Sequence, residues 1–259
     1  MKYYFKIVWI SLLLSSYLAF SYYYFNGWWY SSIGTGLILV FSFLIWGKDF
    51  LKVVGLELSI KTILKTLLLT IGTVVSSLLL IKYIGSKNDI VIQFTSFKNY
   101  YHDAFYILNE EIILGGIPIF LLVNKLKINP IKVSIGLALF FAIIHFAFYK
   151  WIFIEKGLIE CQTLFTLFLV GIVRNNLILV NKHIGYSWAL HFGWMVILFG
   201  CLPIWVETDT EVTEPERFNI FLGSIEMLVI SVVLAGVSLI HMVLSQNPKK
   251  KITKTDVSN

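Results

Sequence analysis

The chain has 259 residues, of which 58% are hydrophobic and only 14% are charged, and its formal net charge is +6. Ordinary soluble domains are about half apolar and about a quarter charged, so this composition excludes most soluble folds. An aromatic content of 16% excludes a disordered chain, and two cysteines are too few for a disulfide framework. The composition therefore predicts an all-α integral membrane protein.

Apolar stretches long enough to cross a bilayer recur along the chain. A hydrocarbon core about 30 Å thick requires a helix of roughly 20 mostly apolar residues. We expect about eight transmembrane helices, at 4–25, 31–47, 61–83, 105–124, 131–150, 159–180, 185–204 and 218–245. Together they predict a single membrane domain over residues 1–259, a polytopic helical bundle that ends in a basic polar tail over 246–259.

Charges at the ends of the spans predict the orientation of the chain. The densest basic cluster is Lys249, Lys250, Lys251 and Lys254 in the tail, whereas the loop over 207–216 is acidic. Because cytoplasmic loops retain lysine and arginine, the tail is expected inside, and an even number of spans places the N-terminus there too. We expect an integral protein of a bacterial plasma (inner) membrane. Its basic residues anchor it to the lipid bilayer and form no patch suited to nucleic acid.

Two adjacent carboxylates, Glu110 and Glu111, open the fourth predicted span. A charge inside a membrane costs several kcal/mol unless it is paired or hydrated, so both are functional candidates. Their side chains lie about 100° apart around a helix, so one can face a cavity while the other orients it. Such a pair suits a general base. In the alternative interpretation both glutamates lie at the water interface and mark the start of the helix.

Two histidines lie in later apolar spans. His145 follows Phe141 by four residues, which places both side chains on one helix face, and His191 lies between Ser187 and Met195. A single intramembrane histidine is often a packing residue, but two on separate helices with a glutamate pair on a third indicate chemistry. Neutral imidazoles and a carboxylate can hold zinc with an open water position. They can also hold a water directly while the carboxylate takes its proton.

The order of these motifs resembles the CPBP family of intramembrane proteases, the CAAX-prenyl-protease and bacteriocin-processing group, also called the ABI family. The family pattern is Glu-Glu-x-x-x-Arg, then Phe-x-x-x-His, then His-x-x-x-Asn. In this chain Glu110 and Glu111, then Phe141 and His145, then His191 follow that order. The resemblance covers about residues 100–200 and extends to the eight helices of the prenyl-protease members.

The resemblance implies an intramembrane endopeptidase of the metalloprotease type that cleaves a peptide or a membrane-anchored protein. It implies that Glu110 activates a water, that Glu111 supports Glu110, and that His145 positions this water or a metal ion. His191 would be a second metal ligand or would stabilise the oxyanion of the tetrahedral intermediate. Both a zinc cofactor held by His145 and His191 and a metal-free water remain open, as does the oligomeric state.

The chain departs from the family pattern at two positions. Gly115 stands where the arginine is expected, and Met195, which cannot donate a hydrogen bond, stands where the asparagine is expected. Losing one oxyanion donor costs about a hundredfold to a thousandfold in rate, which is compatible with slow turnover. The alternative is a catalytically impaired member that acts as a membrane scaffold or a peptide-immunity protein. We interpret Arg174 as a snorkelling residue at the inner boundary of its span and not as a substitute for the missing arginine.

Overall fold

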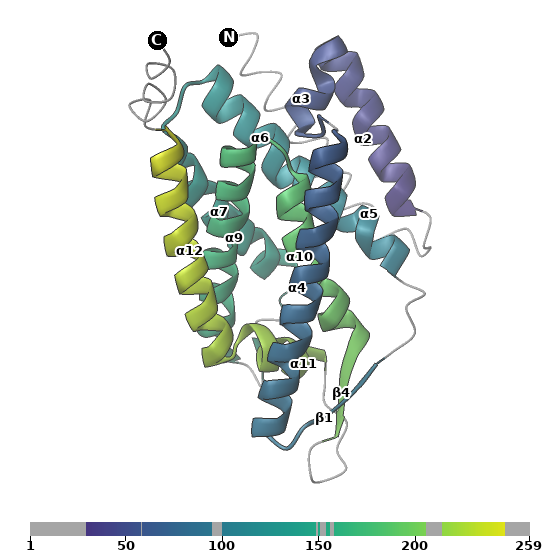
Figure 1. Cartoon of the computed structure of the whole chain (residues 1–259), viewed down its shortest axis with the longest axis vertical. Helices are drawn as coiled ribbons and strands as arrows, with labels where there is room; N and C mark the ends of the chain where they lie inside the picture. Colours follow the sequence, from purple (N-terminus) through teal and green to yellow (C-terminus); the bar gives the residue numbers. More distant parts are fainter. Residues whose placement is uncertain are drawn as a thin grey trace, which may run out of the picture.

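The computed structural model of the chain describes residues 30–57, 59–94, 100–148, 150, 154–155, 158–205 and 214–246. This part of the chain is mostly helical, and the predicted all-α bundle is confirmed. Figure 1 shows α4 (Ile60–Lys87), α9 (Cys161–Asn181) and α12 (Ile225–Gln246) running along the long axis of the molecule. The first predicted span, 4–25, and nearly all of the basic tail lie outside the described residues.

The α-helices are α2 (Tyr30–Trp46), α3 (Phe50–Val54), α4 (Ile60–Lys87), α5 (Tyr100–Glu111), α6 (Ile117–Ile119), α7 (Pro130–Phe148), α9 (Cys161–Asn181), α10 (Gly185–Gly200), α11 (Glu214–Leu222) and α12 (Ile225–Gln246). Gly47–Asp49 (η1) is a 3-10 turn, and Ile112–Gly116 (η3) and Phe120–Lys125 (η4) are π-helical. The strands are β1 (Val91–Phe94), β2 (Ile154–Glu155), β3 (Leu158–Ile159) and β4 (Cys201–Trp205). They form two antiparallel pairs, β1 with β4 and β2 with β3.

Five helices of the described chain are long and apolar enough to cross a membrane, and they make this a membrane protein. They are Ile60–Lys87, Tyr100–Lys125, Pro130–Ala147, Cys161–Asn181 and Ile225–Gln246. The predicted count of about eight is not supported. Helices α2 and α10 have only 17 and 16 residues. Helix α10 ends early because Pro203 lacks the amide hydrogen that a helix needs, and the chain leaves Gly200 as strand β4, which pairs with β1.

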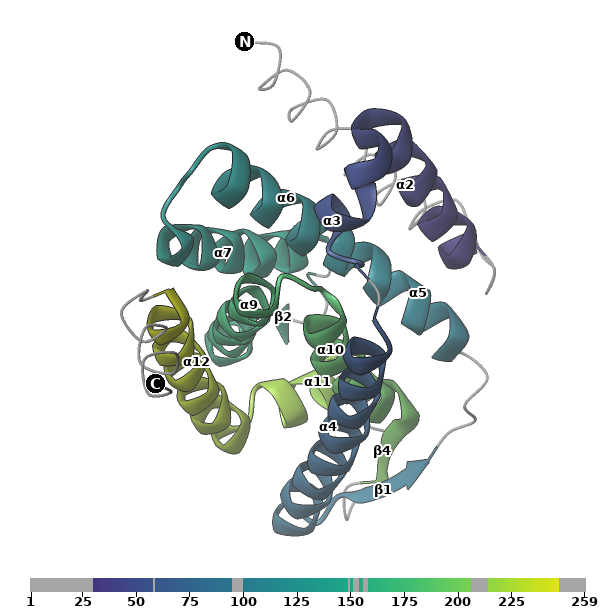
Figure 2. The same ribbon diagram turned by 45° about the horizontal axis from the view of Figure 1, so that its top comes forward.

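Two of these five helices form the centre of the bundle. The rod Tyr100–Lys125 and helix α9 are mostly buried, whereas most residues of α4, α7 and α12 are not buried. Leu68 of α4 and Ile225 of α12, for example, are 68% and 69% exposed, as lipid-facing side chains would be. Figure 2 shows α9 surrounded by α7, α10 and α12. Polar side chains in the middle of the rod and of α9, such as Glu111 and Arg174, are therefore shielded from both water and lipid.

The central rod changes its helical pitch directly after the glutamate pair. Residues Ile112–Gly116 form a π-helical segment, and the amide of Ile117 donates to the carbonyl of Ile112, five residues earlier. Such π-bulges occur frequently at functional sites because they redirect the side chains beside them. Gly116 is required here, because a Cβ at this position would meet the carbonyl oxygen of Val54 in α3. The π-bulge is therefore held both by its own backbone hydrogen bond and by close packing against α3.

His183 joins the end of α9 to the start of α10. Its side chain is 6% exposed, and its Nδ1 accepts a hydrogen bond of 2.8 Å from the amide of Gly185. The proton of the neutral ring is therefore on Nε2. Burial lowers the pKa of His183 below its ordinary value of 6.5, and the nearby Glu57 opposes this effect more weakly.

We expect the folded protein to lose stability through His183 as the pH falls below about 6.5. Below that pH the unfolded chain binds a proton at His183 that the folded chain resists. The contribution of His183 to the free energy of unfolding is therefore complete above about pH 6.5 and is lost as the pH falls further. The unfolding temperature in detergent, measured from pH 8 to pH 5, should fall less steeply for His183→Asn, whose side-chain oxygen can accept the same amide. Identical slopes for the two proteins would contradict this role.

Candidate active site

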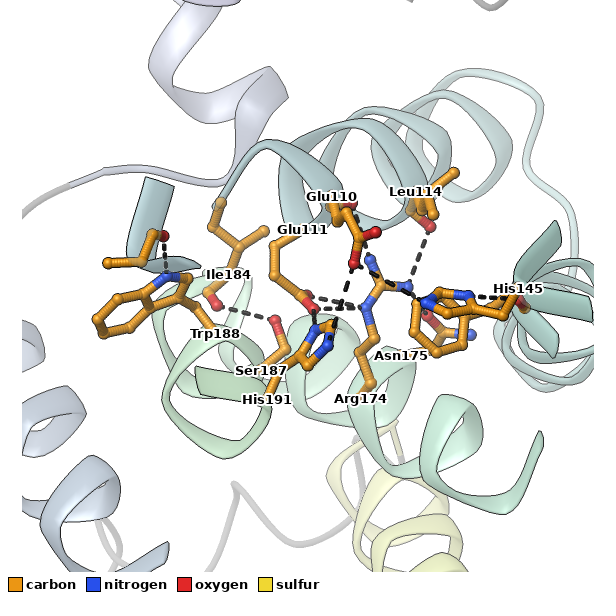
Figure 3. A network of polar contacts seen from close by, with 12 residues as sticks. Glu110, Glu111, Leu114, His145, Arg174, Asn175, Ile184, Ser187, Trp188 and His191 are labelled. Carbon is orange, nitrogen blue, oxygen red and sulfur yellow. Dashed lines mark hydrogen bonds and ion pairs between the residues drawn. The ribbon is translucent and has the colours of Figure 1, made fainter. Parts of the chain in front are cut away.

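The four residues predicted to form the site lie together, although they come from three helices. Glu110 and Glu111 end α5, His145 lies in the last turn of α7, and His191 lies in the first half of α10. Figure 3 shows their side chains turned toward one another, with Arg174 of α9 reaching between them. Because Glu110 and Glu111 are 5% and 0% exposed, the alternative that they mark a helix start at the water interface is wrong.

Glu110 faces both histidines. Its Oε2 lies 4.0 Å from His145 Nε2 and 4.0 Å from His191 Nε2. These separations are too long for hydrogen bonds but short enough for one small group to bridge Glu110 and either histidine. We call Glu110 Oε2 and the two Nε2 atoms the acceptor triangle.

Hydrogen bonds on the far side of each ring fix the proton of both neutral histidines. Nδ1 of His145 lies 2.8 Å from the carbonyl oxygen of Phe141, and Nδ1 of His191 lies 3.1 Å from Glu111 Oε1. A carbonyl and a carboxylate can only accept, so each Nδ1 donates and each Nε2 carries a lone pair. The acceptor triangle thus consists of three acceptors, and a group that brings hydrogen-bond donors or a positive charge complements it.

Glu111 has a different environment from Glu110. The Nε atom of Arg174 donates to both of its carboxylate oxygens, at 2.8 and 2.9 Å, and Arg174 is only 2% exposed. The interpretation of Arg174 as a snorkelling boundary residue is therefore wrong. That interpretation placed the glutamates at the outer end of their span, but the rod already begins at Tyr100, and Glu111 is the last of the 12 residues of α5. Both charges lie deep in the bundle, where pairing is their most favourable state.

The guanidinium of Arg174 also binds the backbone of the central rod. Nη2 donates to the carbonyl of Glu110 at 3.2 Å, and Nη1 donates to the carbonyl of Leu114 at 3.2 Å. Nη1 also lies 3.3 Å from Asn175 Oδ1. These bonds span the start of the π-helical segment. Sequence reasoning missed this role, although an in-span arginine together with the absence of one at position 115 was a usable signal.

Phe141 forms one wall of the site. Its side chain is 1% exposed, and its ring centroid lies 4.2 Å from that of His145 and 6.1 Å from that of His191. The guanidinium carbon of Arg174 lies over the same ring at 4.9 Å. The Phe-x-x-x-His spacing therefore has two structural consequences, since Phe141 orients His145 through its carbonyl and packs the site through its ring.

Trp194 is a second residue that sequence reasoning missed. It follows His191 on α10, and the two ring centroids lie 5.9 Å apart in an edge-to-face arrangement. Trp194 is 5% exposed, and its Nε1 is one of the buried side-chain atoms without a hydrogen-bond partner in the described part of the chain. Trp194 thus brings a buried N–H donor to the side of His191, one residue before Met195, whose side chain has no donor.

The acceptor triangle suits zinc by donor type but not by spacing. Two neutral imidazoles and a carboxylate are ligands that zinc uses, yet two ligands of one tetrahedral zinc lie only about 3.3 Å apart. Here the two histidines lie 4.0 Å from the carboxylate oxygen. Within the described residues, no group of three or more His, Cys, Asp or Glu is arranged to hold a metal ion. The residues as placed do not fit a zinc site.

No family model, curated protein or solved structure matches the chain. The resemblance to the CPBP family therefore depends on the motif residues themselves. In the structure, residues from α5, α7 and α10 that were selected only by sequence pattern converge on one buried point.

Proposed function

We propose that this protein is an intramembrane endopeptidase of the CPBP type, which hydrolyses a peptide bond by means of a water held in the acceptor triangle. The observation that supports this proposal most directly is the position of Glu110, 4.0 Å from two imidazole lone pairs. A water at about 2.8 Å from each atom can bridge two acceptors that lie 4.0 Å apart. Its hydrogens point toward acceptors, and its oxygen lone pairs remain directed at a substrate.

The reaction needs one base and one route for the proton. Glu110 takes a proton from the water as the water oxygen bonds to the peptide carbonyl carbon. The same proton passes from Glu110 to the peptide nitrogen as the C–N bond breaks, which leaves a carboxylic acid and an amine. The second hydrogen of the water binds the Nε2 lone pair of His145 or of His191, which holds the water in line for this attack, and such positioning accounts for a large share of enzymatic rate enhancement.

The two glutamates have separate roles in this proposal. Glu111 is already neutralised by Arg174, which binds both of its oxygens. Arg174 contacts Glu110 only at the backbone carbonyl, so the Glu110 carboxylate keeps its capacity to accept a proton. Glu110 is therefore the base, and Glu111 fixes the ring of His191.

Trp194 supplies the oxyanion donor that Met195 cannot provide. We expect Trp194→Phe to lower kcat by about a hundredfold with little change in KM, because an oxyanion donor acts in the transition state and not in substrate binding. Steady-state kinetics on a fluorogenic peptide measure both constants. A fall in kcat of less than threefold would show that Nε1 makes no such bond.

The substrate class follows from the location of the site. A peptide bond must reach a buried point between apolar helices, which favours a hydrophobic peptide or the end of a membrane-anchored protein. We further propose about eight spans, with α2, α10 and the segment 4–25 added to the five long helices, and both termini in the cytoplasm. Cysteine accessibility on the two sides of the membrane, with single cysteines at the chain ends, tests this topology.

The function is tested by cleavage of a diverse peptide library and of membrane-anchored reporters by the purified protein in detergent, read by mass spectrometry. We expect one or a few new termini with the wild-type protein and none with Glu110→Ala or His145→Ala. Cleavage that survives both substitutions would eliminate this site. Zinc is tested in the same sample: one equivalent per chain, together with loss of cleavage on adding a chelator, would place a metal in the acceptor triangle instead of water.

A further inference from the structure

We infer that Arg174 is a positioning residue for Glu110, and that the absence of a side chain at Gly115 is what admits its guanidinium to the site. The inference depends on the proposed function, since it assigns how the general base is held. Arg174 lies on α9 and forms no part of the acceptor triangle, so it acts on Glu110 through Glu111 and through the backbone of the rod.

Gly115 and Arg174 share one space. A Cβ built on Gly115 would lie 2.8 Å from Arg174 Nη2, 3.3 Å from its Cζ and 2.7 Å from Ile178 Cδ1. The first two atoms belong to a guanidinium held by five hydrogen bonds, so the group cannot retreat without losing them. Any residue larger than glycine at position 115 therefore competes with Arg174 for the same position.

The bonds of Arg174 converge on the backbone that aims Glu110. Nη2 binds the carbonyl of Glu110 itself, and Nη1 binds that of Leu114, inside the π-helical segment. In a π-helix the intrahelical bonds run to the fifth residue, so the carbonyls at its start are displaced from the ordinary α-helical pattern. The guanidinium holds Glu110 and Leu114 at a fixed separation, and Glu111 completes the arrangement by binding both Arg174 and His191.

A guanidinium at position 115 would reach the same carboxylate from the rod itself. Positions 111 and 115 are four residues apart, the spacing at which helix side chains contact each other. The site therefore has room for one guanidinium, which can enter from α9 or from the rod. This predicts a reciprocal rescue: each single substitution damages the site, and the combined exchange restores it.

The experiment compares wild type, Arg174→Ala, Gly115→Arg and the double variant Gly115→Arg/Arg174→Ala. We expect Arg174→Ala to lower kcat by about a hundredfold with KM changed less than threefold, because misplacement of a catalytic group by about 1 Å has this effect. We expect Gly115→Arg alone to be at least as impaired, since two guanidinium groups then compete. The double variant should recover at least tenfold in kcat over Arg174→Ala.

The kcat of a further variant, Arg174→Lys, and the unfolding temperatures of all variants separate a loss of positioning from a loss of folding. Arg174→Lys keeps the charge but not the planar fork, so it should fold and show an intermediate kcat even if Arg174→Ala fails to fold. A wild-type kcat in Arg174→Lys, or a double variant no better than Arg174→Ala in both kcat and unfolding temperature, would overturn the inference. If the wild-type protein cleaves no substrate, the proposed function fails, and the unfolding temperatures alone decide whether position 115 can replace position 174.

Discussion

Glu110→Gln is expected to lower kcat by about 10³-fold while the unfolding temperature stays within about 2 °C of wild type. Glutamine has the shape of glutamate but cannot take a proton from water, and general-base catalysis contributes about 10²–10⁴ to rate. The Glu110 carboxylate has no ion pair with Arg174 to lose, because Arg174 binds only its backbone carbonyl. The loss should therefore be confined to the chemical step and appear in kcat more than in KM.

The matched control for this substitution is Glu226→Gln. Glu226 lies at the start of α12, where it pairs with Lys87 at 2.8 Å, and the Lys87 side chain is 60% exposed. This control removes the same charge by the same change in a membrane-spanning helix, away from the acceptor triangle. Equal losses of cleavage in Glu110→Gln and Glu226→Gln would mean that charge, and not the position of the base, controls activity.

The lengths of the apolar stretches were sufficient to predict the main helices of the bundle. The stretches 61–83 and 159–180 correspond to Ile60–Lys87 and Cys161–Asn181, because burial in lipid demands a continuous apolar helix of this length. The end of the 185–204 stretch was not predictable in this way. The chain there leaves the helix to pair with β1, which lies about a hundred residues earlier, and apolar composition does not distinguish a strand from a helix.

The convergence of Glu110, His145 and His191 was predictable because intramembrane charge is costly and rarely occurs without a function. The role of Arg174 was not predictable from its expected depth in the membrane. That depth was assigned from the ends of the apolar stretches. The rod, however, extends to Tyr100 and has a π-bulge after Glu111, so the carboxylates lie in the same layer as Arg174. Local pattern identifies which residues carry charge, but the pairing of these charges depends on how three helices stack.

The second large effect is expected at the buried pair of Glu111 and Arg174, where one substitution should be far more damaging than two. Glu111→Leu leaves the guanidinium uncompensated among buried groups, and breaking such a pair costs about 3–5 kcal/mol. We therefore expect a loss of that size in the free energy of unfolding, measured by denaturant titration in detergent.

The double variant Glu111→Leu/Arg174→Met should recover most of this loss, since both charges are removed and replaced by apolar groups of similar volume. Its cleavage activity should nevertheless remain low, because the ring of His191 loses its acceptor and the carbonyl of Glu110 loses its donor. Stability and activity would then separate in a single protein. A double variant as unstable as Glu111→Leu would show that the pair contributes packing that methionine and leucine cannot replace, whereas a fully active one would show that the pair serves stability alone.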